Sequence, residues 1–88
     1  LIVMKIGSFW VPKEPLKEVE PFTKGAKYRI TDHNHRMLSE RTSRWVDAML
    51  VENIDDPTDI IEVTEECFKE FFREVTFELV SSHNDMKR

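Results

Sequence analysis

The sequence has little of several residue types, and each shortage excludes a class of protein. It has one cysteine, Cys67, so no disulfide can form within the chain and a reducing, cytoplasmic compartment is expected. With only two glycines, it has no glycine-rich phosphate loop. No apolar run approaches the roughly 20 residues that a membrane-spanning helix needs, so no membrane contact is expected. Basic residues number 13 against 17 acidic ones, whereas a general nucleic-acid binder is usually basic.

What the sequence does contain fits one small globular domain. The chain has 88 residues, of which 40% are hydrophobic and 34% charged, and a chain of this length buries only about 60% of its unfolded surface. Two tryptophans, six phenylalanines and one tyrosine offset the small core, because aromatic side chains each bury a large area. We therefore expect a single domain over residues 1–88, with residues 81–88 as a flexible polar tail.

Short stretches of alternating or β-branched apolar residues predict strands. In residues 26–31, Tyr28 and Ile30 alternate with polar residues, after a Gly25 that permits an unusual backbone angle. Residues 44–54 fit either a strand or a helix, and their β-branched and aromatic content favours a strand with Trp45 in the core. Further strands are predicted over 3–10, 60–63 and 76–80, turns over 32–36 and 55–59, and an exposed connection over 12–21.

One helix is predicted over about residues 64–75. Thr64 is a good N-cap, and Glu65 and Glu66 in the first turn suit the helix dipole. The apolar positions at i, i+3, i+4 and i+7 form one stripe: Phe68, Phe71, Phe72 and Val75. The order of elements predicts an α+β domain, either a small antiparallel sheet or an SH3-like β-barrel of four or five strands, with one C-terminal amphipathic helix.

No set of residues has the spacing of a catalytic or metal site. His33 and His35 could both contact a metal ion, but a closed zinc site needs four ligands, so we interpret them as polar turn residues. Cys67 lies in the first turn of the predicted helix, where neighbouring carboxylates oppose thiolate formation, which favours a structural thiol. The acidic segment 55–59 lacks the glycine and distal glutamate of a calcium-binding loop. We therefore expect no enzyme activity, no cofactor and no metal.

The residues that could bind a partner are aromatic or basic. Trp10 precedes a proline-broken loop and is either a core residue or an exposed anchor, since tryptophan and arginine dominate interface energies. The basic cluster consists of Arg36, Arg41 and Arg44, with Lys27 and Arg29 on the preceding strand. It is either a solvated face or a patch for phosphate or acidic groups. The candidate partner-binding residues are Trp10, Phe22, Tyr28, Arg29, Arg36, Arg41 and Arg44.

Two segments resemble small proteins encoded in phage and prophage genomes. Residues 22–28 are similar to an F-x-K-G-x-x-Y opening motif, and residues 63–75 to a V-x-x-E-x-F-x-x-x-F ending. Together they cover under a third of the chain, and the proline-bounded loop and the strand predicted around Phe77 depart from the pattern. The resemblance implies a small SH3-like β fold closed by a helical turn, in a phage-like accessory protein. It carries over no catalytic residue.

These observations support three hypotheses of function. The leading one is a non-catalytic module that binds another protein, with a phage-encoded modulator or inhibitor of a host protein as its specific form. The alternative is a small nucleic-acid-binding barrel that uses the basic cluster, and the third is a small enzyme that uses Cys67 or the histidines. An exposed Trp10 would support the first hypothesis, and a buried Trp10 counts against it. Pairing of edge strands leaves homodimerisation open.

Overall fold

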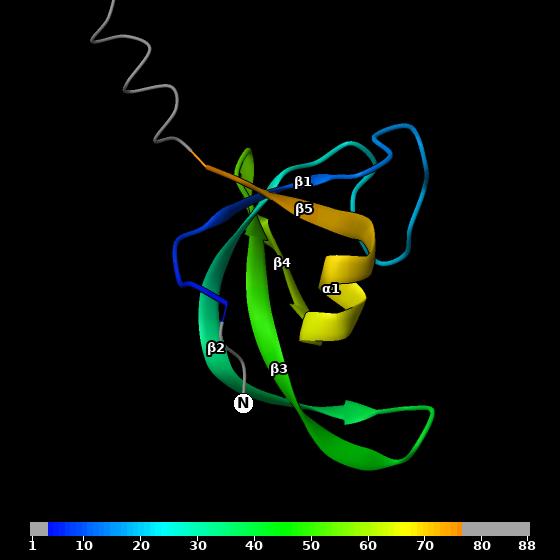
Figure 1. Ribbon diagram of the computed structural model, residues 1–88. Coiled ribbons are helices and arrows are strands. Elements are labelled where there is room, and N and C mark those ends of the chain that lie inside the picture. The colour runs from blue at the N-terminus through cyan, green and yellow to red at the C-terminus, as the bar shows by residue number, and fades with distance from the viewer. Residues whose placement is uncertain (1–3, 77–88) are drawn as a thin grey trace, which may run out of the picture.

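A computed structural model describes residues 4–76, which form a five-stranded antiparallel sheet and one short helix (Figure 1). The elements are β1 (Phe9–Pro12), β2 (Tyr28–Ser39), β3 (Arg44–Asn53), β4 (Asp56–Val63), α1 (Glu65–Phe71) and β5 (Phe72–Val75). The strand order is β4-β3-β2-β1-β5, so β4 and β5 are the two edges of an open sheet. The predicted α+β class with one helix near the C-terminal end is confirmed, in its form as a small antiparallel sheet.

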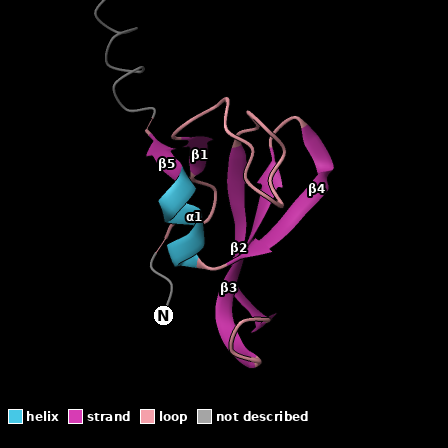
Figure 2. Ribbon diagram, turned by 90° about the vertical axis from the view of Figure 1, so that its right-hand side faces the viewer, coloured by secondary structure: helices cyan, strands magenta, loops and turns pink. Residues whose placement is uncertain are grey.

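The hairpin of β2 and β3 dominates the fold and extends well past α1 (Figure 2). The strand predicted over 44–54 is confirmed by β3. The turn predicted over 32–36 is wrong, because these residues continue β2 through two irregular steps, between Ile30 and Asp32 and between Asp32 and His35. Such bulges let a strand bend and re-aim its side chains without ending. The turn instead occupies residues 40–43, where Ser43 adopts a positive φ of 56°.

Two other strand boundaries differ from the prediction. The first strand begins at Phe9 rather than at residue 3, because the chain before it makes a turn at Gly7, with φ of 86°. The strand predicted over 60–63 begins earlier, at Asp56, and includes Pro57. An edge strand can hold a proline because one side of its backbone needs no donor. Pro12 likewise lies at the end of its strand, opposite Phe72.

The helix begins where predicted and ends earlier. Thr64 is the N-cap, and its hydroxyl oxygen accepts a hydrogen bond from the backbone N–H of Cys67 at 3.3 Å. The helix was predicted to continue to Val75, but it ends at Phe71, and Phe72 starts a strand that pairs with β1. Helical periodicity cannot distinguish these outcomes, since Phe72 is buried in both. The strand predicted over 76–80 and the tail over 81–88 lie outside the described residues, apart from Thr76, which is not in a strand.

The core is an aromatic cluster between the sheet and α1. The largest fully buried side chains are Tyr28, Phe68, Ile30, Met49 and Val51. Phe68 stacks on Phe72 with ring centroids 4.7 Å apart, and Phe22 meets Phe72 edge-on at 4.8 Å. These contacts join α1, β5 and the loop before β2, so a few large rings supply the packing of a small domain.

Candidate protein-interaction surface

The structure buries the three aromatic side chains that the sequence suggested for partner binding. Trp10 is 7% exposed, Phe22 is 8% exposed and Tyr28 is fully buried. The indole N–H of Trp10 donates a hydrogen bond to the hydroxyl of Ser8 at 2.8 Å. Trp10 is therefore a core residue, its interpretation as an exposed anchor is wrong, and its burial counts against the protein-binding hypothesis in the form that relied on Trp10. None of the three can reach a partner while the domain stays folded.

The four predicted arginines are exposed, and the structure separates one from the others. Arg29 lies near the start of β2, with its guanidinium over the ring of Phe9 at 4.7 Å. Arg36, Arg41 and Arg44 lie in or beside the turn of the β2–β3 hairpin. Arg29 and Arg36 are about 20 Å apart along the strand, at about 3.3 Å per residue. The basic cluster thus consists of three arginines at the projecting end of the hairpin.

We call residues 36–47, the projecting end of the hairpin, the arm. Its two exposed apolar side chains are Trp45 and Leu38, which are 63% and 49% exposed and lie opposite each other on the two strands. Arg36 fixes the strand beside them, because its guanidinium donates to the carbonyl of Trp45 at 3.0 Å and lies 3.7 Å from the carboxylate of Asp47. The arm therefore presents an exposed apolar pair on a stretch of backbone that Arg36 contacts.

Trp45 was expected in the core, and this expectation is wrong for an instructive reason. Side chains alternate along a strand, so Trp45 lies on the same face of β3 as Met49 and Val51, which are fully buried. The arm extends past α1, however, and no described element covers the face there (Figure 1). The sequence pattern gives the face of Trp45 correctly but does not show how far the helix reaches.

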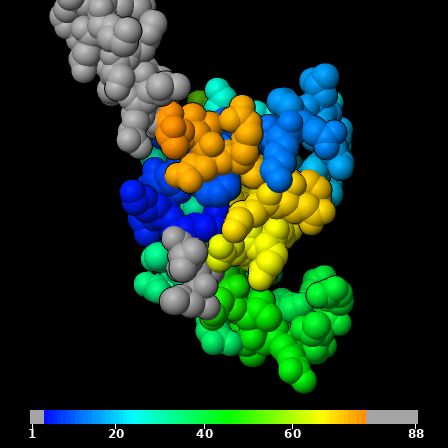
Figure 3. All heavy atoms as spheres, in the orientation of Figure 1, coloured from blue at the N-terminus to red at the C-terminus, as the bar shows by residue number. Residues whose placement is uncertain are grey.

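A cleft lies between the arm and the start of α1, and Figure 3 shows the arm (green) projecting below the helix (yellow). Its volume is about 550 Å³. The lining residues are Ser39, Arg41, Thr42, Val46, Asp47, Thr64, Glu65 and Glu66. We call the acidic end of this cleft, formed by Asp47, Glu65 and Glu66, the foot of the arm. The turn of the arm therefore faces the acidic start of α1 across the cleft, with Arg41 on one side and Glu65 and Glu66 on the other.

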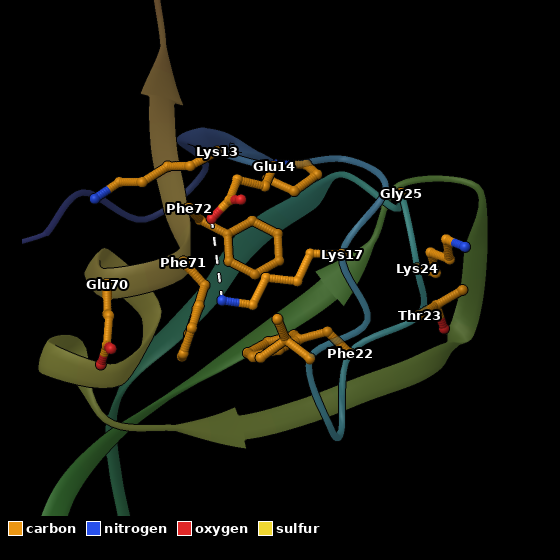
Figure 4. Close-up of a pocket in the computed structure, with 12 residues that line it drawn as sticks. Lys13, Glu14, Lys17, Phe22, Thr23, Lys24, Gly25, Glu70, Phe71 and Phe72 are labelled. Carbon is orange, nitrogen blue, oxygen red and sulfur yellow. Dashed lines mark ion pairs between the residues drawn. The ribbon is translucent and has the colours of Figure 1, made fainter.

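Two other hollows are weaker candidates. The one drawn in Figure 4 lies between Phe22, Phe71 and Phe72, with Lys17 across its opening, 5.5 Å from the ring of Phe71. Its enclosed volume of about 30 Å³ holds about one water molecule, far below the roughly 300 Å³ or more of a ligand site.

The second hollow is apolar and measures about 270 Å³. It lies on the outer face of β1 and β5, between Phe9, Val11 and Val75. The guanidinium of Arg29 covers the ring of Phe9, so the largest apolar side chain there already has a partner.

A polar cluster around Asp59 ties the loop before β2 to the β3–β4 hairpin. One carboxylate oxygen of Asp59 accepts hydrogen bonds from the hydroxyls of Thr23 and Tyr28, both at 2.8 Å, and from the amide of Asn53 at 3.1 Å. Burial raises the pKa of Asp59, but the three hydrogen bonds outweigh it and the pKa is lowered overall. Burial raises the pKa of Tyr28. Because every donor is satisfied within the cluster, its arrangement is that of a structural clamp.

The residues considered for catalysis or metal binding are dispersed. Cys67 is half-buried, and burial, with a smaller contribution from the charge of Glu70, raises the pKa of its thiol. This opposes thiolate formation. His33 and His35 lie within β2 rather than in a turn, and the ring of His35 contacts the carboxylate of Glu62 on β4. Within residues 4–76, no three histidine, cysteine or acidic side chains gather closely enough to hold a metal ion.

Comparisons of the chain with models of known protein families, with curated proteins and with solved structures find no match. Among the residues that the structure describes, no helix has the length and apolar character needed to cross a bilayer.

Proposed function

We propose that this chain is a non-catalytic protein-binding module that contacts its partner through the arm. The observation that carries the proposal is the exposure of Trp45 beside Leu38 at a projecting position. Tryptophan and arginine are the residues that most often dominate interface energies. Neighbouring exposed apolar side chains that form one contiguous patch are typical of an interaction site.

The charges of the arm favour a protein over a nucleic acid. Arg36, Arg41 and Arg44 are accompanied by Glu40 and Asp47 within the arm. The foot adds the carboxylates of α1, so a phosphate backbone lying along the arm would meet negative charge. Affinity for nucleic acids comes largely from neutralised phosphates, which this distribution does not supply. The more specific role, a phage-encoded modulator of a host protein, rests on the two sequence segments that resemble phage proteins.

The test is capture of partners from a lysate of the proposed host cell, with the purified chain as bait. Three baits are compared: the natural chain, a Trp45→Ala variant and an Ile60→Ala variant. Ile60 is a matched control, because it is also an exposed apolar strand residue, 52% exposed, but lies on β4 away from the arm. The bound material is washed at low and high salt and analysed for both protein and nucleic acid.

The proposal expects a stoichiometric protein that survives high salt, is retained by Ile60→Ala and is lost with Trp45→Ala. Loss with both variants would point to a general effect of apolar exposure and contradict a role for the arm. Recovery of nucleic acid at low salt and its loss at high salt would favour the nucleic-acid alternative. Turnover of a substrate by the purified chain would contradict the non-catalytic assignment.

A further inference from the structure

We infer that the apolar hollow on the outer face of β1 and β5 is the docking site of the chain segment that follows it, residues 77–80. The residues that line this hollow lie outside the arm, so its occupant is independent of the proposed function. The segment contains the apolar residues Phe77, Leu79 and Val80, with Glu78 between the first two. Three features of the hollow favour this occupant: its position in the chain, its size and the charges around it.

The hollow lies beside the last described residue of the chain. Val75 lines it, and the next residue, Thr76, lines a neighbouring hollow that shares Phe9 and Val75 with the first. Consecutive Cα atoms are about 3.8 Å apart, so the Cα atom of Phe77 is at most about 7.6 Å from that of Val75, whatever the backbone does between them. Aromatic side chains reach across such a distance. Phe77 is therefore tethered within reach of the hollow.

The size of the hollow favours tethered side chains over a free ligand. Its volume is about 270 Å³, below the roughly 300 Å³ at which ligand sites begin, and one of its walls, Ile54, is 37% exposed. A group that is joined to its site by a short link has an effective concentration in the millimolar range. A free group of the same affinity must exceed that concentration to displace it, so the segment is the preferred occupant.

The charges on this face of the sheet complement the carboxylate of Glu78. Lys27 lines the hollow, and Arg73 of β5 is on the same face, because it lies directly opposite one of the lining residues. Within residues 4–76, Lys27 and Arg73 make no ion pair, whereas Arg29 faces Glu52 across the β2–β3 pairing. A segment with one carboxylate between apolar side chains therefore suits both the apolar walls of the hollow and the two cations beside it.

Nuclear magnetic resonance of the full chain tests the contact directly. We expect nuclear Overhauser effects between the ring protons of Phe77 and the methyl groups of Val11 and Ile54. Phe77→Ala should raise the equilibrium constant for unfolding about tenfold, the effect of burying about half of a phenylalanine side chain. Leu16→Ala is the matched control, because Leu16 is 86% exposed, and it should leave the constant unchanged.

A double-mutant cycle assigns the effect to the hollow. In an Ile54→Ala background, the factor by which Phe77→Ala raises the unfolding constant should be at least about three times smaller, because residues in contact do not act additively. In an Ile60→Ala background the factor should stay the same, since Ile60 is an exposed residue of β4 that does not line the hollow. Glu78→Lys should raise the constant at low salt and less at high salt, whereas Glu18→Lys, in the exposed loop before β2, should not change it.

Two results would overturn the inference: no contact between Phe77 and the walls of the hollow, or additive effects of Phe77→Ala and Ile54→Ala. Contacts that appear only as the protein concentration rises would also overturn it, because the segment of a second copy would then fill the hollow. None of these measurements involves Trp45. The docking of residues 77–80 and the proposed function can therefore fail independently of each other.

Discussion

Replacement of Tyr28 by phenylalanine should destabilise the domain by about 1.5 kcal/mol. The substitution keeps the buried ring and its edge-on contacts with Phe22 and Phe72, and it removes the hydroxyl that donates to Asp59 at 2.8 Å. A hydrogen bond to a charged group contributes about 1.5–3 kcal/mol, and the lower end applies because Asp59 is only half-buried. The backbone N–H of Thr23 also loses its acceptor, but Thr23 is exposed and water can replace it.

Thermal and urea unfolding of the two proteins measure this effect. For a domain of this size, 1.5 kcal/mol corresponds to a fall in melting temperature of about 6–12 °C. A double-mutant cycle isolates the bond: in an Asp59→Ala background, the same Tyr28→Phe change should cost at least about 1 kcal/mol less. An equal cost in both backgrounds would show that the hydroxyl does not act through Asp59 and would refute the reasoning.

The same cluster makes stability depend on pH in a defined direction. The pKa of Asp59 is lower in the folded protein than in the unfolded chain, so its charged form stabilises the fold at pH values above the unfolded pKa. This contribution is lost as the pH falls below about 4 and through the lower folded pKa. The difference in unfolding free energy between the natural chain and Asp59→Ala should therefore shrink on acidification. A difference that grows would contradict the direction of the shift.

Three other predictions test the core, the helix cap and the thiol. Phe68→Ala should cost about 3–5 kcal/mol because Phe68 is fully buried, whereas Trp45→Ala should change stability by no more than about 0.5 kcal/mol; urea unfolding measures both, and similar costs would contradict the assigned burial. Thr64→Ala should lower the free energy of unfolding by about 1 kcal/mol, because the N-cap hydrogen bond is lost. An unchanged melting temperature would show that this hydrogen bond does not stabilise the domain. Cys67 should react with a disulfide reagent at neutral pH more slowly than free cysteine, because its pKa is raised; equal rates would contradict its burial.

Sequence reasoning succeeded where one local interaction decides the structure. The cap at Thr64 and the positive φ of Gly25 follow from side-chain chemistry within a few residues. It failed where distant pairing decides. The polar character of residues 32–36 predicted a turn. These residues instead belong to a strand that pairs with β3, and the bulges let β2 continue through them. Phe72 continues a helical stripe, yet its backbone pairs with β1.

The candidate site shows the same limit at the level of the surface. Two of the strongest aromatic candidates, Trp10 and Tyr28, are the residues that the core needs most. Trp45 was excluded because its strand face is apolar and points inward. Burial depends on whether a second element covers that face, and α1 is only seven residues long, about 10 Å at 1.5 Å per residue. A helix of that length cannot cover a ten-residue strand, β3, of roughly 33 Å.

Stability and binding therefore involve different residues in this chain, and this makes the proposals testable one at a time. The side chains that hold the fold together, such as Tyr28, Asp59 and Phe68, lie between the sheet, α1 and the loop before β2. Trp45 and Leu38 are 63% and 49% exposed, so they contribute little to folding. Their replacement should leave the unfolding free energy nearly unchanged while it removes binding. If both properties fell together, the arm would be part of the folded core, and the distinction on which the proposed function depends would be lost.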